Sequence, residues 1–213
     1  AHHKKVFCKE LFTQYIPNQK LNMFLIFSTM MLYVAILYLF GISLTTLKYL
    51  LLTPLLISVL VIDFKERIIP DRLILILFEI GMVFSIIEGF GSLNIFVDKI
   101  LGMIIGFGIF GLITLIGGLL TKKKAMGYGD VKLMAALGLI FGEIGILMII
   151  VISFLIAAIV SIVLLVIRKK KFTEYIAFGP YISVASFIVM MGSTNVLLYT
   201  LLKIFTLGTY SLG

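Results

Sequence analysis

Two aspartates lie where long apolar runs meet polar, lysine-rich segments. Asp63 directly follows the apolar stretch 55–62, and Asp130 ends the tetrapeptide Gly-Tyr-Gly-Asp at 127–130. A carboxyl at the edge of a bilayer can reach water, so it can ionise and exchange a proton. Two such carboxyls on one membrane face predict an acid–base pair, because neighbouring carboxyls cannot both ionise cheaply and therefore share a proton.

A pair of this kind can hydrolyse a peptide bond. The ionised member takes a proton from a water that attacks the carbonyl carbon, and the protonated member polarises the carbonyl oxygen and later protonates the leaving amine. Each aspartate also has a plainer interpretation. Asp130 is a good helix N-cap after a glycine-rich turn, and Asp63 begins a charged loop that water can solvate. Neither plainer role requires a second aspartate on the same face.

Composition limits the other chemistry available to the chain. The 213 residues are 62% hydrophobic and only 13% charged, with a mean hydropathy of +1.22, which indicates an integral membrane protein. The only cysteine is Cys8, and the only histidines are His2 and His3, which with Ala1 resemble the remnant of an affinity tag. Serine–histidine and cysteine–histidine nucleophiles, zinc-binding cysteine clusters and HExxH metal sites are therefore excluded from the body of the chain, and we expect no metal site.

Long apolar segments predict an all-α, polytopic bundle of transmembrane helices. A spanning helix needs about 20 apolar residues, and the fifth of seven segments is too short to cross upright. We therefore expect about six spans plus one short or tilted helix. The segments are Met23–Ile42, Leu44–Ile62, Leu73–Ile87, Ile95–Leu120, Val131–Phe141, Ile144–Ile167 and Tyr181–Phe205.

The lysines and arginines predict the orientation. With the N-terminus inside and seven crossings, 15 of the 18 basic residues fall in inner loops, and only Lys48, Lys99 and Lys203 fall outside. Such a bias follows the positive-inside rule. The net charge of +8 thus records topology and does not indicate a nucleic-acid partner. The same alternation places Asp63 and Asp130 at the cytoplasmic ends of their helices.

Several residues within the apolar segments are expected to be structural. Gly102 and Gly106, like Gly138 and Gly142, have the small-xxx-small spacing that lets helices approach closely. This spacing is interpreted either as a tight helix contact that holds the aspartates in place or as the ordinary composition of membrane helices, in which glycine is common. Glu79 lies inside the third segment, where structural hydrogen bonding is a better interpretation than catalysis. The carboxyls at the outer ends are expected to be solvated; they are Glu88, Asp98 and Glu143.

Three ordered motifs resemble those of prepilin leader peptidases, which belong to the GxGD class of intramembrane aspartyl proteases. The run GYGDVKLMAALG at 127–138 resembles the second signature of that family, and the run 63–73, with Ile-Pro-Asp at 69–71, resembles the first. The stretch AFGPY at 177–181 resembles a third segment, with Ala177 in place of the usual proline.

The resemblance implies that Asp63 and Asp130 are catalytic. It implies cleavage of the basic leader of type IV prepilins or pseudopilins on the cytoplasmic side of the inner (plasma) membrane, without a cofactor. The glycines Gly127 and Gly129 carry over as motif positions that bind substrate or support the site. Seven further residues carry over in the same way. They are Lys65, Pro70, Asp71, Lys132, Phe178, Gly179 and Pro180.

The resemblance is incomplete at the N-terminus. Many bacterial members carry a further helix and a cytoplasmic loop with paired zinc-binding cysteines, a region associated with methylation by S-adenosylmethionine, whereas this sequence has Cys8 alone. A short-form or N-terminally truncated member is therefore implied, with residues 1–22 as tag remnant and cytoplasmic segment and 23–213 as a membrane-embedded peptidase domain. S-adenosylmethionine would be needed only for a methyltransferase activity.

Two other classes of function remain open from the residues. A small transporter or channel could use Asp63, Glu79 and Asp130 as proton or cation sites, although transporters commonly show two related halves and no internal repeat is found. A helical scaffold of an export machine would need no active site.

Overall fold

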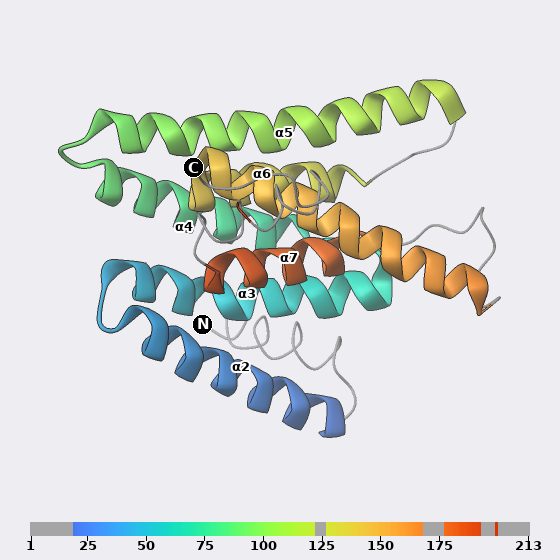
Figure 1. Ribbon diagram of the computed structural model, residues 1–213, viewed down its shortest axis with the longest axis horizontal. Helices are drawn as coiled ribbons and strands as arrows, with labels where there is room; N and C mark the ends of the chain where they lie inside the picture. Colours follow the sequence, from blue (N-terminus) through green and yellow to red (C-terminus); the bar gives the residue numbers. More distant parts are fainter. Residues whose placement is uncertain (1–18, 122–126, 168–176, 193–198, 200–213) are drawn as a thin grey trace, which may run out of the picture. The chain divides into compact units, whose positions relative to one another are not determined.

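The described residues are helical throughout, apart from turns between helices. The structure is a computed structural model, and it describes residues 19–121, 127–167, 177–192 and 199. Six helices, α2 to α7, occur in these ranges, which confirms the all-α prediction (Figure 1). Two predicted parts lie mostly outside the described residues. They are the N-terminal segment 1–22 and the part of the last segment that follows Gly192.

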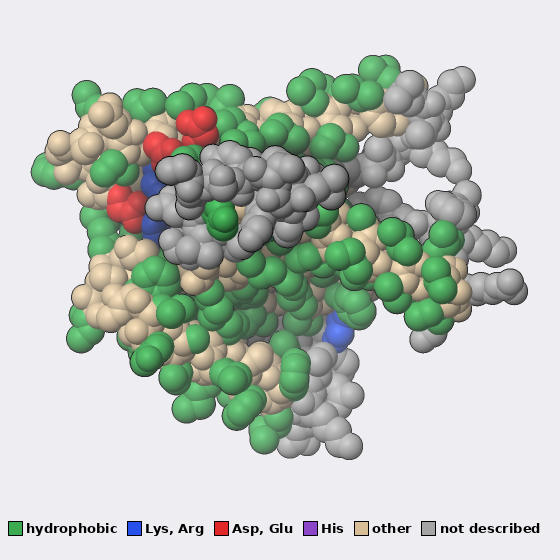
Figure 2. Space-filling model, viewed as in Figure 1, with side chains coloured by type: hydrophobic (Ala, Val, Ile, Leu, Met, Phe, Trp, Pro, Cys, Tyr) green, Lys and Arg blue, Asp and Glu red, His purple; other side chains and the backbone are tan. Residues whose placement is uncertain are grey.

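Four described helices are long and apolar enough to cross a membrane: α2 (Gln19–Phe40), α3 (Leu44–Glu66), α5 (Leu93–Thr121) and α6 (Tyr128–Val166). The other two are α4 (Asp71–Gly89), which carries four charged residues, and α7 (Gly179–Met191), which has only 13 residues. On the face drawn in Figure 2, the described side chains are mainly hydrophobic and few are charged. A surface of this kind suits a hydrocarbon solvent.

The chain divides into two compact parts, with the boundary after Ile57, inside α3. In the first part, a tight turn joins α2 to α3, and Gly41 takes the left-handed φ of 58° there. The hydroxyl of Thr46 donates to the carbonyl of Gly41 at 2.7 Å, and the rings of Phe40 and Tyr49 meet edge to face at 5.3 Å. These contacts fix the helix pair locally.

In the second part, α6 is interrupted at Gly142, where φ is 77° and ψ is −173°. The chain folds back at this point, because Gly106 of α5 lies against both Met134 and Ile146. Twelve residues of straight helix would separate those two by about 18 Å. In Figure 1 the yellow first part of α6 and its orange second part accordingly run in opposite directions. The structure therefore confirms the predicted division into a short fifth segment and a longer sixth one.

Glycines bring α5 against both halves of α6. A methyl group on Gly102 would lie 2.5 Å from the carbonyl carbon of Gly142 and 2.6 Å from the carbonyl oxygen of Gly138. A methyl group on Gly106 would lie 2.5 Å from the carbonyl oxygen of Met134. Only glycine permits backbones to come this close, so of the two interpretations of the small-xxx-small spacing the structure supports a close helix contact.

Charged side chains of α4 and α5 surround the break in α6. Asp98 packs against Gly142, and its carboxylate accepts a hydrogen bond from the Glu143 N–H at 3.2 Å. Lys99 donates to the carbonyl of Ile140 at 3.3 Å and pairs with Glu88 at 3.6 Å. The expectation that Glu88 and Asp98 are merely solvated is therefore wrong. The Asp98 carboxylate caps the helix that starts after the break, and the Lys99 ammonium group caps the helix that ends before it. Both charges have the sign that the helix dipole favours.

Candidate active site

Asp63 lies in the last turn of α3, where the helix gives way to the segment 67–70. Its side chain is buried, with 4% of its surface exposed, and Oδ2 accepts a hydrogen bond from the backbone N–H of Gly179 at 2.8 Å. Gly179 is the first residue of α7, so its N–H has no acceptor within its own helix. A methyl group on Gly179 would lie 2.6 Å from the same carboxylate oxygen, and glycine is required there.

Asp130 lies in the first turn of α6 and is also only 4% exposed. Gly127 is the N-cap of this helix, and the Asp130 N–H donates to the carbonyl of Gly127 at 3.1 Å. The residue before Asp130, Gly129, packs on Ile69, six residues after Asp63, so both aspartates lie at the same junction of segments. Two aspartates that are 67 positions apart in sequence thus share one buried environment. Whether they are catalytic stays a prediction.

The segment between α3 and α4 supports the turn before Asp130. Arg67 adopts a left-handed φ of 56°, which bends the chain directly after α3. Ile69 is buried, and a methyl group on Gly129 would lie 3.2 Å from the Ile69 Cβ. Pro70 follows as the N-cap of α4. The first and second motifs therefore pack directly on each other, with Gly129 supplying the room.

Aromatic rings hold the third motif. Phe178 is the N-cap of α7, and its ring lies 5.7 Å from that of Phe110 and 5.2 Å from that of Phe154. Pro180 follows Gly179 in the first turn of α7, where its lack of an N–H costs nothing. The ring cluster thus anchors the residue before Gly179 to α5 and α6, and fixes the N–H that points at Asp63. Phe110 and Phe154 were not predicted, because an apolar residue in an apolar helix carries no local signal.

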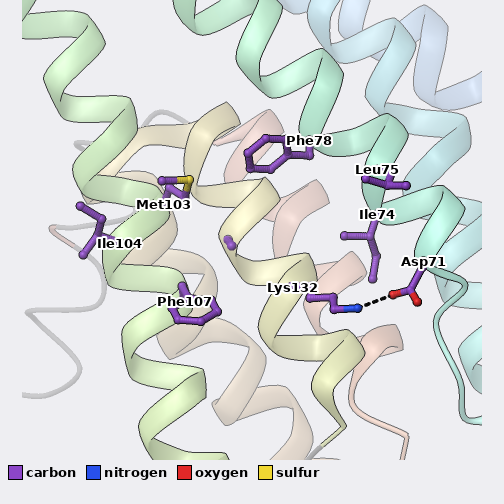
Figure 3. A pocket seen from close by; sticks show the side chains of 9 residues that line it. Asp71, Ile74, Leu75, Phe78, Met103, Ile104, Phe107 and Lys132 are labelled. Atoms are coloured by element: carbon purple, nitrogen blue, oxygen red, sulfur yellow. Dashed lines mark hydrogen bonds and ion pairs between the residues drawn. The ribbon is translucent and has the colours of Figure 1, made fainter.

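The remaining motif residues are more exposed. Lys132 pairs with Asp71 at 2.6 Å, which joins α6 to α4 (Figure 3). Lys65 is exposed on the last turn of α3. Glu79 is exposed on α4 rather than enclosed in a buried hydrogen-bonding site, contrary to the structural role expected for it. Among the residues in the described ranges, no group of three or more His, Cys, Asp or Glu side chains could hold a metal ion.

Comparison with known proteins places these motifs in a family. A family model described as the type IV leader peptidase family matches residues 50–162, a range that includes both buried aspartates. Curated relatives bear the name prepilin leader peptidase/N-methyltransferase. One from Aeromonas hydrophila is 34% identical over 71% of this chain and 51% of its own length, and one from Neisseria gonorrhoeae is 35% identical over 74% and 52%.

A relative of the same name from Xanthomonas campestris is 32% identical over 78% of this chain and 57% of its own length. The chain thus spans about half the length of the curated relatives it matches. No solved structure matches it. The family model covers more than half of the chain, and the three motifs meet at one place in the fold: this protein belongs to the type IV leader peptidase family.

Proposed function

We propose that this chain is an aspartic endopeptidase that cleaves the basic leader peptide of a type IV prepilin or pseudopilin. The observation that carries the proposal is the burial of Asp63 and Asp130 together, at the junction of three family motifs. Burying one carboxyl is costly, and burying two side by side is costlier still unless they share a proton. A shared proton is what an acid–base pair requires.

We assign the ionised role to Asp63 and the protonated role to Asp130. The Gly179 N–H donates to Asp63, and a donor of this kind favours the ionised carboxylate. Asp63 then takes a proton from water as the oxygen attacks the scissile carbonyl carbon, while protonated Asp130 donates to the carbonyl oxygen. When the tetrahedral intermediate collapses and the C–N bond breaks, the hydroxyl formed on the carbonyl oxygen returns its proton to Asp130, and Asp130 protonates the leaving nitrogen as the carboxyl product forms. The proton held by Asp63 restores the starting state with one proton on the pair, and the carboxyl product releases one proton to water. The cycle needs no cofactor.

We place the site at the cytoplasmic face of the inner membrane, from the distribution of the basic residues. The lipid bilayer and the prepilin or pseudopilin are the partners in this proposal. The curated relatives are also named as N-methyltransferases. S-adenosylmethionine would serve only that second reaction, and none of the residues assigned to peptide cleavage requires it.

Replacing one buried aspartate tests the proposal. Asp63→Asn or Asp130→Asn should lower the rate of leader cleavage by about 1,000-fold or more, because neither can exchange the proton that drives the reaction. The measurement is cleavage of a purified prepilin by the variant in lipid vesicles, with helix content followed by circular dichroism. A transporter or a scaffold would show no cleavage even with the unchanged sequence.

Asp98→Asn is the matched control. Asp98 also packs against a glycine and accepts a backbone N–H, but it lies at the break in α6. This variant should cleave within about three-fold of the unchanged protein, since its expected effect is on helix capping. Retained cleavage in Asp63→Asn or Asp130→Asn would refute the mechanism.

A further inference from the structure

A cavity of about 730 Å³ lies between α4 and α5, on the side of α6 that carries the Asp71–Lys132 pair. Its volume falls in the range of about 300–1,000 Å³ typical of small-molecule sites. Figure 3 shows α6 as its back wall, with side chains of α4 and α5 on either side. We name it the α4/α5 groove, and its apolar lining includes Leu75, Phe78, Met103, Ile104, Phe107 and Ala135.

The groove opens toward the surrounding medium along its length. Leu75 is 59% exposed, Ile104 is 55% exposed and Phe107 is 56% exposed. Ile104 and Phe107 lie on α5, which is long and apolar enough to cross a bilayer, where exposed side chains face acyl chains. From Asp71 to Phe78 the groove follows α4 for about 10 Å, at 1.5 Å per residue. It is thus an elongated apolar channel along a helix, which suits a flexible hydrocarbon chain.

One end of the groove is charged. Asp71 and Lys132 pair there at 2.6 Å, and their side chains remain 71% and 53% exposed. A lysine ammonium has three donors and a carboxylate about four acceptor sites, so the ion pair leaves capacity on both partners. A ligand that offers an anion to Lys132 and a cation to Asp71 complements this end better than a ligand with a single charge.

The position of the groove argues against the peptidase substrate as its occupant. Lys132 follows Asp130 by two residues, which turns it by about 200° around the helix axis. The groove and the buried aspartates therefore lie on opposite sides of α6. A peptide in the groove would have to pass around the first turn of α6 to reach Asp63.

We propose that the α4/α5 groove binds one acyl chain of a phospholipid whose headgroup carries both a phosphate and a primary ammonium group. The chain lies between α4 and α5, the phosphate contacts Lys132, and the ammonium group contacts Asp71. Phosphatidylethanolamine has this chemistry. Phosphatidylcholine lacks the N–H donors that a carboxylate accepts, and phosphatidylglycerol lacks the cation.

The absence of tryptophan from the sequence makes the test direct. Phe78→Trp places a single indole in the groove, and Val83→Trp places one on the exposed side of the same helix. Each variant is reconstituted in phosphatidylcholine vesicles that contain a minor, equal fraction of brominated phosphatidylethanolamine, phosphatidylcholine or phosphatidylglycerol. Bromine quenches an indole that it contacts. Comparing headgroups at one indole cancels the difference in depth between the two positions.

At Phe78→Trp, brominated phosphatidylethanolamine should show about a five-fold higher apparent affinity than brominated phosphatidylcholine, the size expected of one exposed charge-assisted contact. At Val83→Trp the two lipids should quench equally. Adding Asp71→Asn to Phe78→Trp should abolish the preference. Equal quenching by all three lipids at Phe78→Trp would overturn the proposal, as would stronger quenching by phosphatidylglycerol.

A second arm separates a lipid from a peptide. Titrating prepilin into Phe78→Trp vesicles should leave the quenching by brominated phosphatidylethanolamine unchanged. Relief of quenching by the peptide would show that the groove belongs to the substrate and would refute the lipid assignment. Both arms read lipid contact and need no peptidase activity, so a failure here leaves the proposed cleavage reaction untouched, and the reverse also holds.

Discussion

An aspartate lies against a glycine near each end of the short helix 128–141, but the two aspartates have different surroundings. At one end, Asp63 accepts the Gly179 N–H at 2.8 Å. At the other end, about 17 Å away along the helix, Asp98 accepts the Glu143 N–H at 3.2 Å and packs on Gly142. The local contact is nearly the same at both ends: a carboxylate receives a backbone donor from the start of a helix.

The surroundings of each aspartate differ. Asp63 is buried at the same junction as a second buried carboxyl, Asp130, whereas Asp98 is followed in α5 by Lys99, which pairs with Glu88. At the end near Gly142, the Glu88 carboxylate lies near the cation of Lys99, and Asp98 acts as a structural helix cap. At the other end we propose that the two acids share a proton, an arrangement that costs stability and enables chemistry. A helix-capping contact thus becomes a candidate catalytic group through the charges placed around it.

After the two aspartates themselves, the largest effect is expected from Gly179→Ala. The added methyl would lie 2.6 Å from the Asp63 oxygen, so the start of α7 must shift and the hydrogen bond must lengthen. Displacements of about 1 Å at such sites cost on the order of 100-fold in rate, and we expect that loss in kcat/KM for leader cleavage. Gly108→Ala is the control, because a methyl there meets nothing within 4 Å. Unchanged kcat/KM in Gly179→Ala would remove Gly179 from the site.

Gly142→Ala should act on stability. Its φ of 77° strains any residue with a Cβ, and the added methyl would collide with the Asp98 carboxylate. We expect the free energy of unfolding to fall by about 2 kcal/mol, measured by thermal unfolding in detergent. Gly91→Ala separates backbone strain from the collision with Asp98, because Gly91 also has a left-handed φ, of 94°, but an added methyl there meets nothing within 4 Å. Equal losses in both variants would show that the contact with Asp98 contributes nothing.

Lys99→Met should cost less, about 1–2 kcal/mol, because it leaves the Glu88 carboxylate and the Ile140 carbonyl without their Lys99 partner. The double variant with Glu88→Gln should be more stable than Lys99→Met alone, since the carboxylate is then neutral. A double-mutant cycle in unfolding free energy measures this coupling. Strictly additive losses would argue against a paired cap at this end.

The smallest effect is expected from the Asp71–Lys132 pair. Both side chains are largely exposed, and exposed pairs contribute about 0–1 kcal/mol. Lys132→Gln should therefore lower the unfolding free energy by about 0.5 kcal/mol or less, and high salt should erase the difference. A loss above about 2 kcal/mol would mean that the pair is desolvated in the membrane.

Much of the fold follows from the sequence because its signals are local. The apolar runs predict the helices within a few residues, and α5 extends only two residues before and one beyond its predicted segment of 95–120. The predicted division of 131–167 into a short and a long segment agrees with the break at Gly142. The glycine spacings predict a close helix contact, because small residues are what such contacts need. The three motifs also single out the two aspartates before any coordinates are considered.

Tertiary structure alone decides which distant groups meet. Nothing near Asp63 in the sequence indicates that a backbone N–H 116 positions later will bond to it, or that the rings of Phe110 and Phe154 will hold that N–H in place. The capping role of Asp98 was likewise invisible, because it depends on α6 folding back beside α5. Residue type and spacing determine which chemistry is available to this chain. Packing determines which carboxylate is neutralised by a cation and which is left beside another acid, because charge interactions depend on distance in space and not along the chain.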